Sequence, residues 1–214
     1  MIEINVSNEI KSVCPEFAFS AVQCRVKNSL YNEELWRAIK EFSKKFASET
    51  ALNQINKLPN IVETREVYKK LGKDPNRYRP SGEALCRRVV RGIPLYQIST
   101  LVDLINLVSL QSGYSIGGFD ADKIEGNLTL GVGKAGEKFE AIGRGLLNIE
   151  GLPVYRDNIG GIGTPTSDEE RTKISLETTN LLMIINGYSG EKGLAEVTEY
   201  AKELLALFCD ADFE

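Results

Sequence analysis

The sequence STLVDLINLVSLQSGYSIGGFDADKIEG, residues 99–126, begins as an almost uninterrupted run of apolar residues. At helical spacing this run carries apolar side chains on nearly every side, which predicts a helix that is buried in the core. Ser99 is suited to be the N-cap of this helix, and Gly113 follows its last periodic residue as a C-cap. We therefore expect the rest of the chain to pack around it.

Three polar residues interrupt the apolar helix. Asp103, Asn106 and Ser109 recur every three positions and so share one face. A buried carboxylate or amide needs hydrogen-bond partners, and we predict that Asp103 and Asn106 bond to the glycine-containing turn 117–122. Two interpretations are open: a structural polar network that holds a loop, or a pocket lined by backbone amides and a few carboxylates.

The same segment resembles the B3/B4 domain of the phenylalanyl-tRNA synthetase beta subunit, which has the pattern VVDxxNYVxLExGxPxHAFDxDKI. The matching residues are Val102, Asp103, Asn106, Val108, Leu110, Gly113, Phe119, Asp120, Asp122, Lys123 and Ile124. The resemblance continues through GEKFEAIGRG at 136–145 and IGGIGTPTSDEERTKISLE at 159–177, and in all it covers about residues 75–185. The chain looks most like the free-standing B3/B4 proteins, which are not attached to a synthetase.

The resemblance implies a β-sandwich core of unusual topology with helices packed on it. Local patterns agree with an α+β class, because helices gather in the first half and at the C-terminus, with strands between them. We expect one domain over 1–214, with a mostly helical part at 1–74, a B3/B4-like core at 75–187 and a C-terminal helix within 188–214.

Periodicity predicts the other elements. Helices are expected over 32–48, 61–71, 81–92 and 193–208. Strands are expected over 17–26, 127–132 and 152–155, with a hairpin across 138–149. Residues 158–167 read as a glycine-rich loop, 168–170 as the start of a short turn or helix, and 174–187 as a strand pair or one long bent strand.

Composition excludes several classes of protein and of site. The 214 residues are 42% hydrophobic and 26% charged, and no apolar run is long enough to span a bilayer, so we expect no membrane partner. The first residues lack the pattern of a signal peptide, and a cytoplasmic location is expected. The four cysteines, which show no metal-ligand spacing, are expected to be reduced and buried.

The chain contains no histidine. This excludes a Ser-His-Asp or Cys-His catalytic site and any histidine-ligated metal. Asp103, Asp120 and Asp122 form no octahedral ligand pattern, so no metal site is expected. The glycines at 160–163 lack a following Lys-Ser/Thr and so make no nucleotide loop, and no cofactor is expected. Catalysis, if present, must use carboxylates, hydroxyls, lysine, cysteine, backbone amides or groups of the substrate.

Glu177 is the candidate catalytic residue. It lies beside an apolar run, and a carboxylate at the edge of the core can have a raised pKa and act as an acid, a base or an orienting group. By the resemblance, Glu177 matches the glutamate of the family's ILLE motif, which belongs to the pocket that edits wrongly attached tyrosine. The expected substrate-binding residues are Asp103, Asn106, Gly117, Gly118, Gly160, Gly161 and Gly163.

Two positions depart from the family's editing pocket. Gly117 stands where the family has the histidine of HAFD, and Ile105 stands where it has a threonine. Since glycine leaves more volume and removes one donor, we expect a larger or differently polar side chain to fit a cavity bounded by Asn106, Gly117, Gly118, Glu177 and residues 160–163.

Basic residues gather between 65 and 91, although the net charge of the chain is −4. The expected RNA-binding residues are Arg77, Arg79, Arg87, Arg88 and Arg91, with Tyr78 as a stacking surface. The alternative is a solvated helical face with scattered ion pairs.

Three functions remain open at this level. The first is a stand-alone protein that binds tRNA and hydrolyses a mischarged aminoacyl ester. The second is a module that binds tRNA or an amino acid without turnover. The missing histidine and threonine favour this second function, whereas the retained glutamate and glycine loop favour the first. The third is a structural interaction protein. The sequence selects neither the amino acid nor the tRNA nor the oligomeric state.

Overall fold

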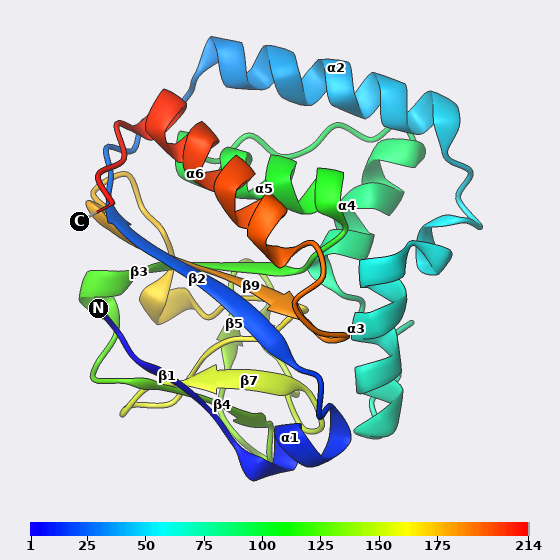
Figure 1. Ribbon diagram of the computed structural model, residues 1–214, viewed down its shortest axis with the longest axis vertical. Coiled ribbons are helices and arrows are strands. Elements are labelled where there is room, and N and C mark those ends of the chain that lie inside the picture. The colour runs from blue at the N-terminus through cyan, green and yellow to red at the C-terminus, as the bar shows by residue number, and fades with distance from the viewer. Residues whose placement is uncertain (214) are drawn as a thin grey trace.

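The computed structural model describes residues 1–213 as two stacked β-sheets with most of the helices on the outer face of one sheet (Figure 1). The strands are β1 (Ile4–Val6), β2 (Ala18–Arg25), β3 (Ile116–Asp120), β4 (Leu128–Val132), β5 (Glu140–Ala141), β6 (Gly145–Leu146), β7 (Pro153–Arg156), β8 (Gly161–Gly163) and β9 (Asn180–Gly187). The α-helices are α1 (Asn8–Val13), α2 (Glu33–Glu49), α3 (Pro59–Lys70), α4 (Ser81–Val90), α5 (Thr100–Ser112) and α6 (Leu194–Cys209). Short 3-10 turns lie at Ile55–Lys57, Ala121–Lys123 and Glu170–Thr172.

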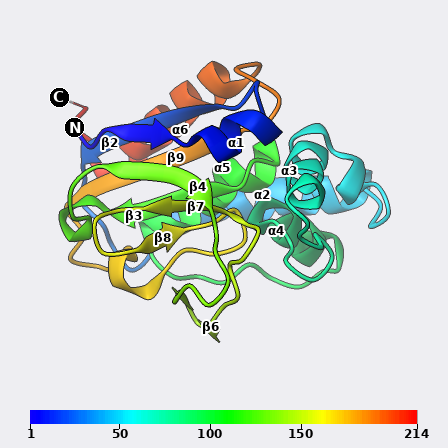
Figure 2. The ribbon, with the colours of Figure 1, turned by 90° about the horizontal axis from the view of Figure 1, so that it is seen from below.

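The two sheets differ in topology. One has the order β2-β9-β3 and is antiparallel throughout. The other has the order β1-β4-β7-β8, in which β1 and β4 are parallel and the remaining pairs are antiparallel. Strands β5 and β6 form a separate hairpin, and Figure 2 shows its β6 end projecting from the body of the molecule.

Strand β9 explains why the sheets and helices form layers. Its sequence NLLMIING is apolar on both faces, as expected for a strand covered on both sides. Leu181, Met183 and Ile185 pack against the helices, while Leu182 and Ile184 pack between the sheets. The inter-sheet core also contains Phe119, Leu128, Leu130, Tyr155 and Ile162.

Helix α5 lies at the centre of the helical layer, in contact with α2, α4 and α6 (Figure 1). Gly113 ends it in the left-handed conformation, as expected. Ser99 occupies the N-cap position, but its side chain makes no capping bond. Instead Asn28, which follows β2, accepts from the N–H of Leu101 at 3.1 Å, so the cap comes from a distant segment.

The structure confirms the α+β class with helices packed on a sandwich-like core. The expected helical character of 1–74 is incomplete, because β1 and β2 lie in this part and join opposite sheets. The predicted turn at 117–118 is wrong: these glycines belong to β3. The loop 158–167 contains β8, and 174–187 holds one strand, β9.

Two further findings bear on function. Cys14, Cys24, Cys86 and Cys209 are free and buried, as expected. Within residues 1–213, every helix is too short or too polar to cross a bilayer.

Candidate functional site

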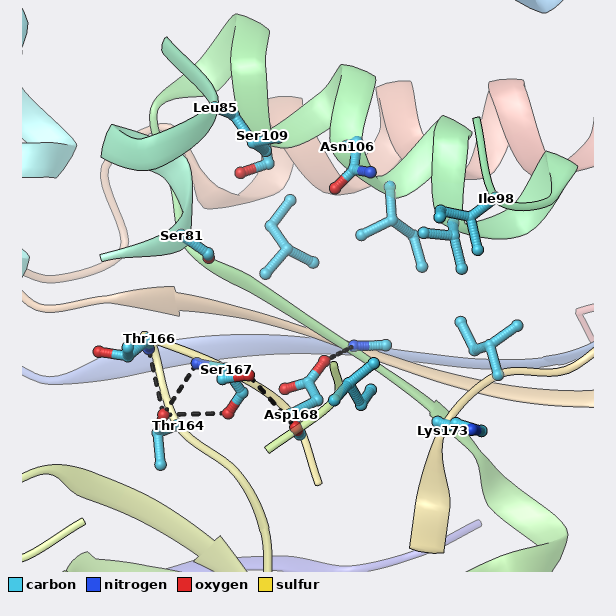
Figure 3. A pocket seen from close by; sticks show the side chains of 16 residues that line it. Ser81, Leu85, Ile98, Asn106, Ser109, Thr164, Thr166, Ser167, Asp168 and Lys173 are labelled. Carbon is cyan, nitrogen blue, oxygen red and sulfur yellow. Dashed lines mark hydrogen bonds between the residues drawn. The ribbon is translucent and has the colours of Figure 1, made fainter. Parts of the chain in front are cut away.

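A cavity of about 430 Å³ opens between the helical layer and the segment that follows β8. It is lined by Ser81, Leu85, Ile98, Val102, Ile105, Asn106, Ser109, Ile116, Gly118, Ile142, Thr164, Thr166, Ser167, Asp168, Lys173 and Ile174. Figure 3 shows Asn106 and Ser109 projecting from α5, with Thr164 to Asp168 on the opposite wall. The site is therefore assembled from α4, α5, β3 and the segment 164–174.

Much of the lining is apolar and comes from branched aliphatic residues of α5, β3 and the flanking loops. These residues are Ile98, Val102, Ile105, Ile116, Ile142 and Ile174. The wall that faces α5 carries the hydroxyls and the carboxylate of residues 164–168. Ser81, Asn106 and Ser109 add polar groups from the side of α4 and α5. An apolar cavity with a few polar groups suits a small organic ligand that has an apolar body and a polar end.

The polar wall is rigid because its turn is bonded to itself and to its neighbours. The Thr164 hydroxyl accepts from the backbone N–H groups of Thr166 and Ser167 at 3.1 and 3.0 Å (Figure 3). The Thr166 hydroxyl lies 2.9 Å from that of Tyr68 in α3. The N–H of Ser81 donates to the Pro165 carbonyl at 2.7 Å, which joins the turn to α4.

Asp168 follows this turn, and its side chain reaches the edge of β3 that faces away from β9. Its Oδ2 accepts from the backbone N–H of Gly118 at 3.3 Å (Figure 3). Gly163 makes room for the carboxylate, because a Cβ there would lie 2.8 Å from Asp168 Oδ1 and 2.5 Å from the Phe119 ring. Burial raises the pKa of Asp168 to about 7, and the Gly118 N–H opposes this only in part.

A second hollow of about 450 Å³ adjoins the cavity and is lined by arginines. We call it the arginine groove; its cationic residues are Arg79, Arg87, Arg88, Arg91 and Arg144. The groove and the cavity share Ser81, Leu85, Ile98, Asn106 and Thr166. A ligand lying across these shared residues would have one end among aliphatic side chains and the other among guanidinium groups.

Glu83 of α4 organises the cations at one end of the groove. Its side chain is 0% exposed and lies 2.8 Å from Arg65, 2.7 Å from Arg87 and 3.6 Å from Arg79. One buried carboxylate thus holds three guanidinium groups from α3, the preceding loop and α4, and the cluster keeps a positive excess. Since Arg79 is 37% and Arg87 is 17% exposed, this excess charge reaches the groove.

At the other end of the groove, Arg88 lies over the ring of Tyr96 at 3.9 Å and donates to the Pro94 carbonyl. Tyr96 is 66% exposed. Arg91 is exposed at the end of α4. An exposed aromatic ring beside guanidinium groups suits a ligand that combines bases with phosphates.

Comparison with known proteins agrees with the resemblance seen in the motifs. The model of the B3/4 domain matches residues 63–201, which is more than half of the chain. The chain belongs to the B3/4 domain family. All residues that line the cavity and the arginine groove of this B3/4 domain lie inside the matched span.

Two known proteins are similar to parts of this chain. A phenylalanine–tRNA ligase beta subunit from Bartonella henselae is 31% identical over 99 residues, covering 42% of this chain and 12% of that subunit. An N-terminal fragment of the phenylalanyl-tRNA synthetase beta-subunit from Pyrococcus horikoshii, known from its crystal structure, aligns at 16% identity with a TM-score of 0.47. That alignment covers 95% of this chain and 49% of the fragment. The chain therefore spans less than half of either relative.

The structure brings only two of the expected pocket residues of the B3/4 domain to the cavity. Asn106 and Gly118 line it. Gly117 lies on the inter-sheet face of β3, where a Cβ would be 2.8 Å from the Phe119 ring. The volume left by the missing side chain is thus filled by Phe119, and the expectation that Gly117 enlarges the cavity is wrong.

Asp103 has a structural role instead of the expected bond to the 117–122 segment. It is 1% exposed and accepts from the indole N–H of Trp36 at 2.7 Å and from the N–H of Ile98 at 3.0 Å. These bonds fix α5 to α2 and to the preceding loop. Burial raises the pKa of Asp103, and the bonds from Ile98 and Trp36 oppose that shift. Among residues 1–213, nothing in 117–122 hydrogen-bonds to the Asn106 amide either.

The expected boundary formed by Glu177 and residues 160–163 is also wrong. Glu177 lies exposed in a turn before β9, and a hydrogen bond from Ser175 lowers its pKa instead of raising it. Gly160 precedes β8, while Gly161 and Gly163 belong to it, and none of the three lines the cavity. Gly163 acts indirectly, since it makes room for Asp168.

Four of the five arginines expected at an RNA surface line the arginine groove: Arg79, Arg87, Arg88 and Arg91. Arg77 is exposed outside it, near the Tyr78 ring. The ion pairs expected under the alternative interpretation are present as well, but three of them converge on the buried Glu83, which organises the arginines instead of neutralising them all.

Sequence reasoning missed Asp168 and Glu83. Asp168 follows Ser167, and this order suggested the start of a helix; the helical turn begins later, with Glu169 as its cap. The signal for Glu83 was present in the spacing of Arg79, Glu83 and Arg87, which are four residues apart: Glu83 and Arg87 share one face of α4, and Arg79 lies just before that helix. Across residues 1–213, no three acidic or cysteine side chains gather closely enough to hold a metal ion.

Proposed function

We propose that this B3/4 domain binds the aminoacylated 3′ end of a tRNA and hydrolyses the ester of a mischarged amino acid. The main support is the continuity of the apolar cavity with the arginine groove through shared lining residues. An aminoacyl-tRNA end has two matching parts, a polyanionic strand with stacking bases and an amino acid side chain. The kinship with a phenylalanine–tRNA ligase beta subunit favours this class of ligand.

In this proposal the ester lies where the cavity meets the groove. Ser81, Asn106 and Thr166 line both hollows, so their polar groups are near the bond that joins the amino acid to the ribose. Water adds to the ester carbonyl carbon, the bond to the ribose oxygen breaks, and that oxygen takes up the proton that the water releases. The residues contribute mainly by holding the ester and the water in place, which requires no histidine.

A deacylation assay across a panel of mischarged tRNAs tests the proposal. We expect turnover of at least one aminoacyl ester, and we expect Asn106→Ala to reduce the rate about tenfold or more, equivalent to about 1.4 kcal/mol per factor of ten. Gln111→Ala is the matched control, because Gln111 is exposed on the same helix and lines neither hollow. Equal rates for Asn106→Ala and the wild type would remove Asn106 from the site.

One observation favours a second candidate, binding without turnover. Glu177, the carboxylate expected to act in the pocket, lies outside the cavity, and the chain has no histidine. A protein that holds tRNA or an amino acid would need only the cavity and the groove. Tight binding of an aminoacyl-tRNA with no loss of its ester, across the whole panel, would establish this second function in place of the first.

A further inference from the structure

We infer that Asp168 is the anchor for a primary ammonium group, so that the cavity takes an α-amino acid or its ester with a free amino group and an apolar side chain. This assignment deepens the proposed function and rests on it for the place of the amino acid. The sequence patterns did not single out Asp168. Its role as an anchor would restrict the site to ligands with a free α-amino group.

The first support is that the carboxylate has unused hydrogen-bonding capacity. An ionised carboxylate accepts up to about four hydrogen bonds, whereas the Asp168 carboxylate accepts one from residues 1–213, the Gly118 N–H at 3.3 Å. Among residues 1–213, no lysine or arginine forms an ion pair with it. A carboxylate kept without a cation in a largely apolar hollow is energetically costly, and a bound cation removes that cost.

The second support is that, within the described part of the chain, the cavity lining has no unpaired cation that could neutralise Asp168 in place of a ligand. Lys173 is the other charged residue in the lining, and its ammonium is paired with Glu170. Arg144 lines the groove instead of the cavity. The neighbouring carboxylate of Glu169 does not line the cavity, and it accepts from the N–H of Arg171 at 2.8 Å. Asp168 is therefore the negatively charged group of the cavity lining to which a cationic ligand can bind.

The third support is that the fold reserves space for this carboxylate. Gly163 and Gly117 lie behind it, where a Cβ would approach Asp168 Oδ1 to 2.8 and 3.7 Å respectively. The segment is held on both sides, because the Asp168 carbonyl accepts from the N–H of Ile142 at 3.0 Å and residue 168 bridges Gly163. The side chain is thus positioned before a ligand arrives, which reduces the entropy lost on binding.

The chemistry of the lining then sets what the site accepts. An α-ammonium at Asp168 would direct the amino acid side chain toward the aliphatic residues of α5 and β3, and the carboxyl carbon toward the arginine groove. An N-acylated amino acid carries no charge at that nitrogen and adds bulk, so it is excluded. The site thereby discriminates free α-amino groups from blocked ones.

Binding of two matched probes to the full chain tests the inference. The first probe is 3′-deoxy-3′-(L-leucylamino)adenosine, and the second is the same compound with hydrogen in place of the α-amino group. We expect the amine to bind about 30-fold or more tightly than its deamino counterpart, and we expect Asp168→Asn to abolish that ratio. Asp122→Asn is the control, because Asp122 is exposed and lines neither hollow. A ratio near one in the wild type, or a ratio unchanged in Asp168→Asn, overturns the inference.

A measurement on the wild type alone guards against a variant that fails to fold. The pKa of the Asp168 carboxyl, followed by ¹³C NMR, should fall when the leucyl probe is added and stay unchanged with the deamino probe. Equal responses to both probes contradict the assignment.

The inference and the proposed function fail in different ways. Amine-dependent binding without deacylation of any charged tRNA leaves Asp168 as the anchor and removes the hydrolysis. Deacylation that is equally fast on aminoacyl-tRNA and on N-acetyl-aminoacyl-tRNA keeps the hydrolysis and removes the anchor. Absence of binding by every probe together with absence of turnover removes both.

Discussion

At the scale of single residues, the important side chains of this B3/4 domain are polar groups whose partners lie far away in sequence. The Asp168 carboxylate accepts a hydrogen bond from the Gly118 N–H and occupies space that Gly163 leaves open. No local pattern contains this information, because an aspartate after Ser167 equally well begins a helix. Asn106 could be placed from the sequence, since its spacing on an apolar helix fixes its face. Glu177 could not, because its position in an exposed turn depends on where β9 begins.

The raised pKa of Asp168 has a consequence for stability. Because the folded pKa of about 7 exceeds the ordinary 3.8, the native state retains a proton that the unfolded chain has lost between these values. Stability therefore falls as the pH rises through this window, and the full cost is present above pH 7. At pH 8 the free energy of unfolding of Asp168→Asn should exceed that of the wild type by about 2 kcal/mol. This is less than the full pKa shift of Asp168 implies, because its side chain is partly exposed.

Urea denaturation at two pH values checks this expectation. The difference between Asp168→Asn and the wild type should shrink toward zero at pH 4, where both side chains are neutral. A difference of the same size at pH 4 and pH 8 would mean that ionisation of Asp168 does not cause it.

At the scale of elements, α4 and α5 were predictable and the wall opposite them was not. Apolar periodicity and the caps locate α5 within one or two residues. Strand β8 has only three residues, two of them glycine, and it forms because β7 offers an edge rather than because its sequence favours a strand. The cavity lies between one wall that periodicity specifies and another that only tertiary pairing specifies.

Helix α4 carries the second prediction at this scale. Removing the charge of Glu83 leaves Arg65 and Arg87 without their buried counter-charge, so Glu83→Gln should lower the free energy of unfolding by about 3 kcal/mol. Glu66→Gln, which breaks an exposed pair with Lys69, should change it by less than about 1 kcal/mol. Thermal and urea unfolding compare the two. Equal effects would show that the buried cluster adds nothing to stability.

At the scale of the whole molecule, a chain of net charge −4 presents a concentrated positive groove. The sequence predicted the α+β class and the basic stretch, because both follow from local composition. It did not predict that the basic stretch would border the cavity, since this depends on how α4 packs beside α5 and on the turn at 164–167.

This charge distribution predicts a salt-dependent affinity for tRNA. Arg91→Ala should weaken binding and reduce the slope of log affinity against log salt by about 0.7–0.9, the value for one lost phosphate contact. Arg77→Ala makes the same change in charge outside the arginine groove and should alter neither quantity. Slopes that respond equally to both variants would assign binding to the net charge of the region instead of to the groove.

The central claim is that the cavity holds the amino acid while the arginine groove holds the RNA end. It is tested most directly by the ratio of affinities for leucyl-tRNA with a non-hydrolysable 3′-amide linkage and for the same tRNA uncharged. We expect the charged form to bind at least about tenfold more tightly. Val102→Phe, which fills the cavity without touching the groove, should reduce this ratio to one and leave the affinity for uncharged tRNA unchanged. Equal affinity of the wild type for charged and uncharged tRNA would contradict the claim.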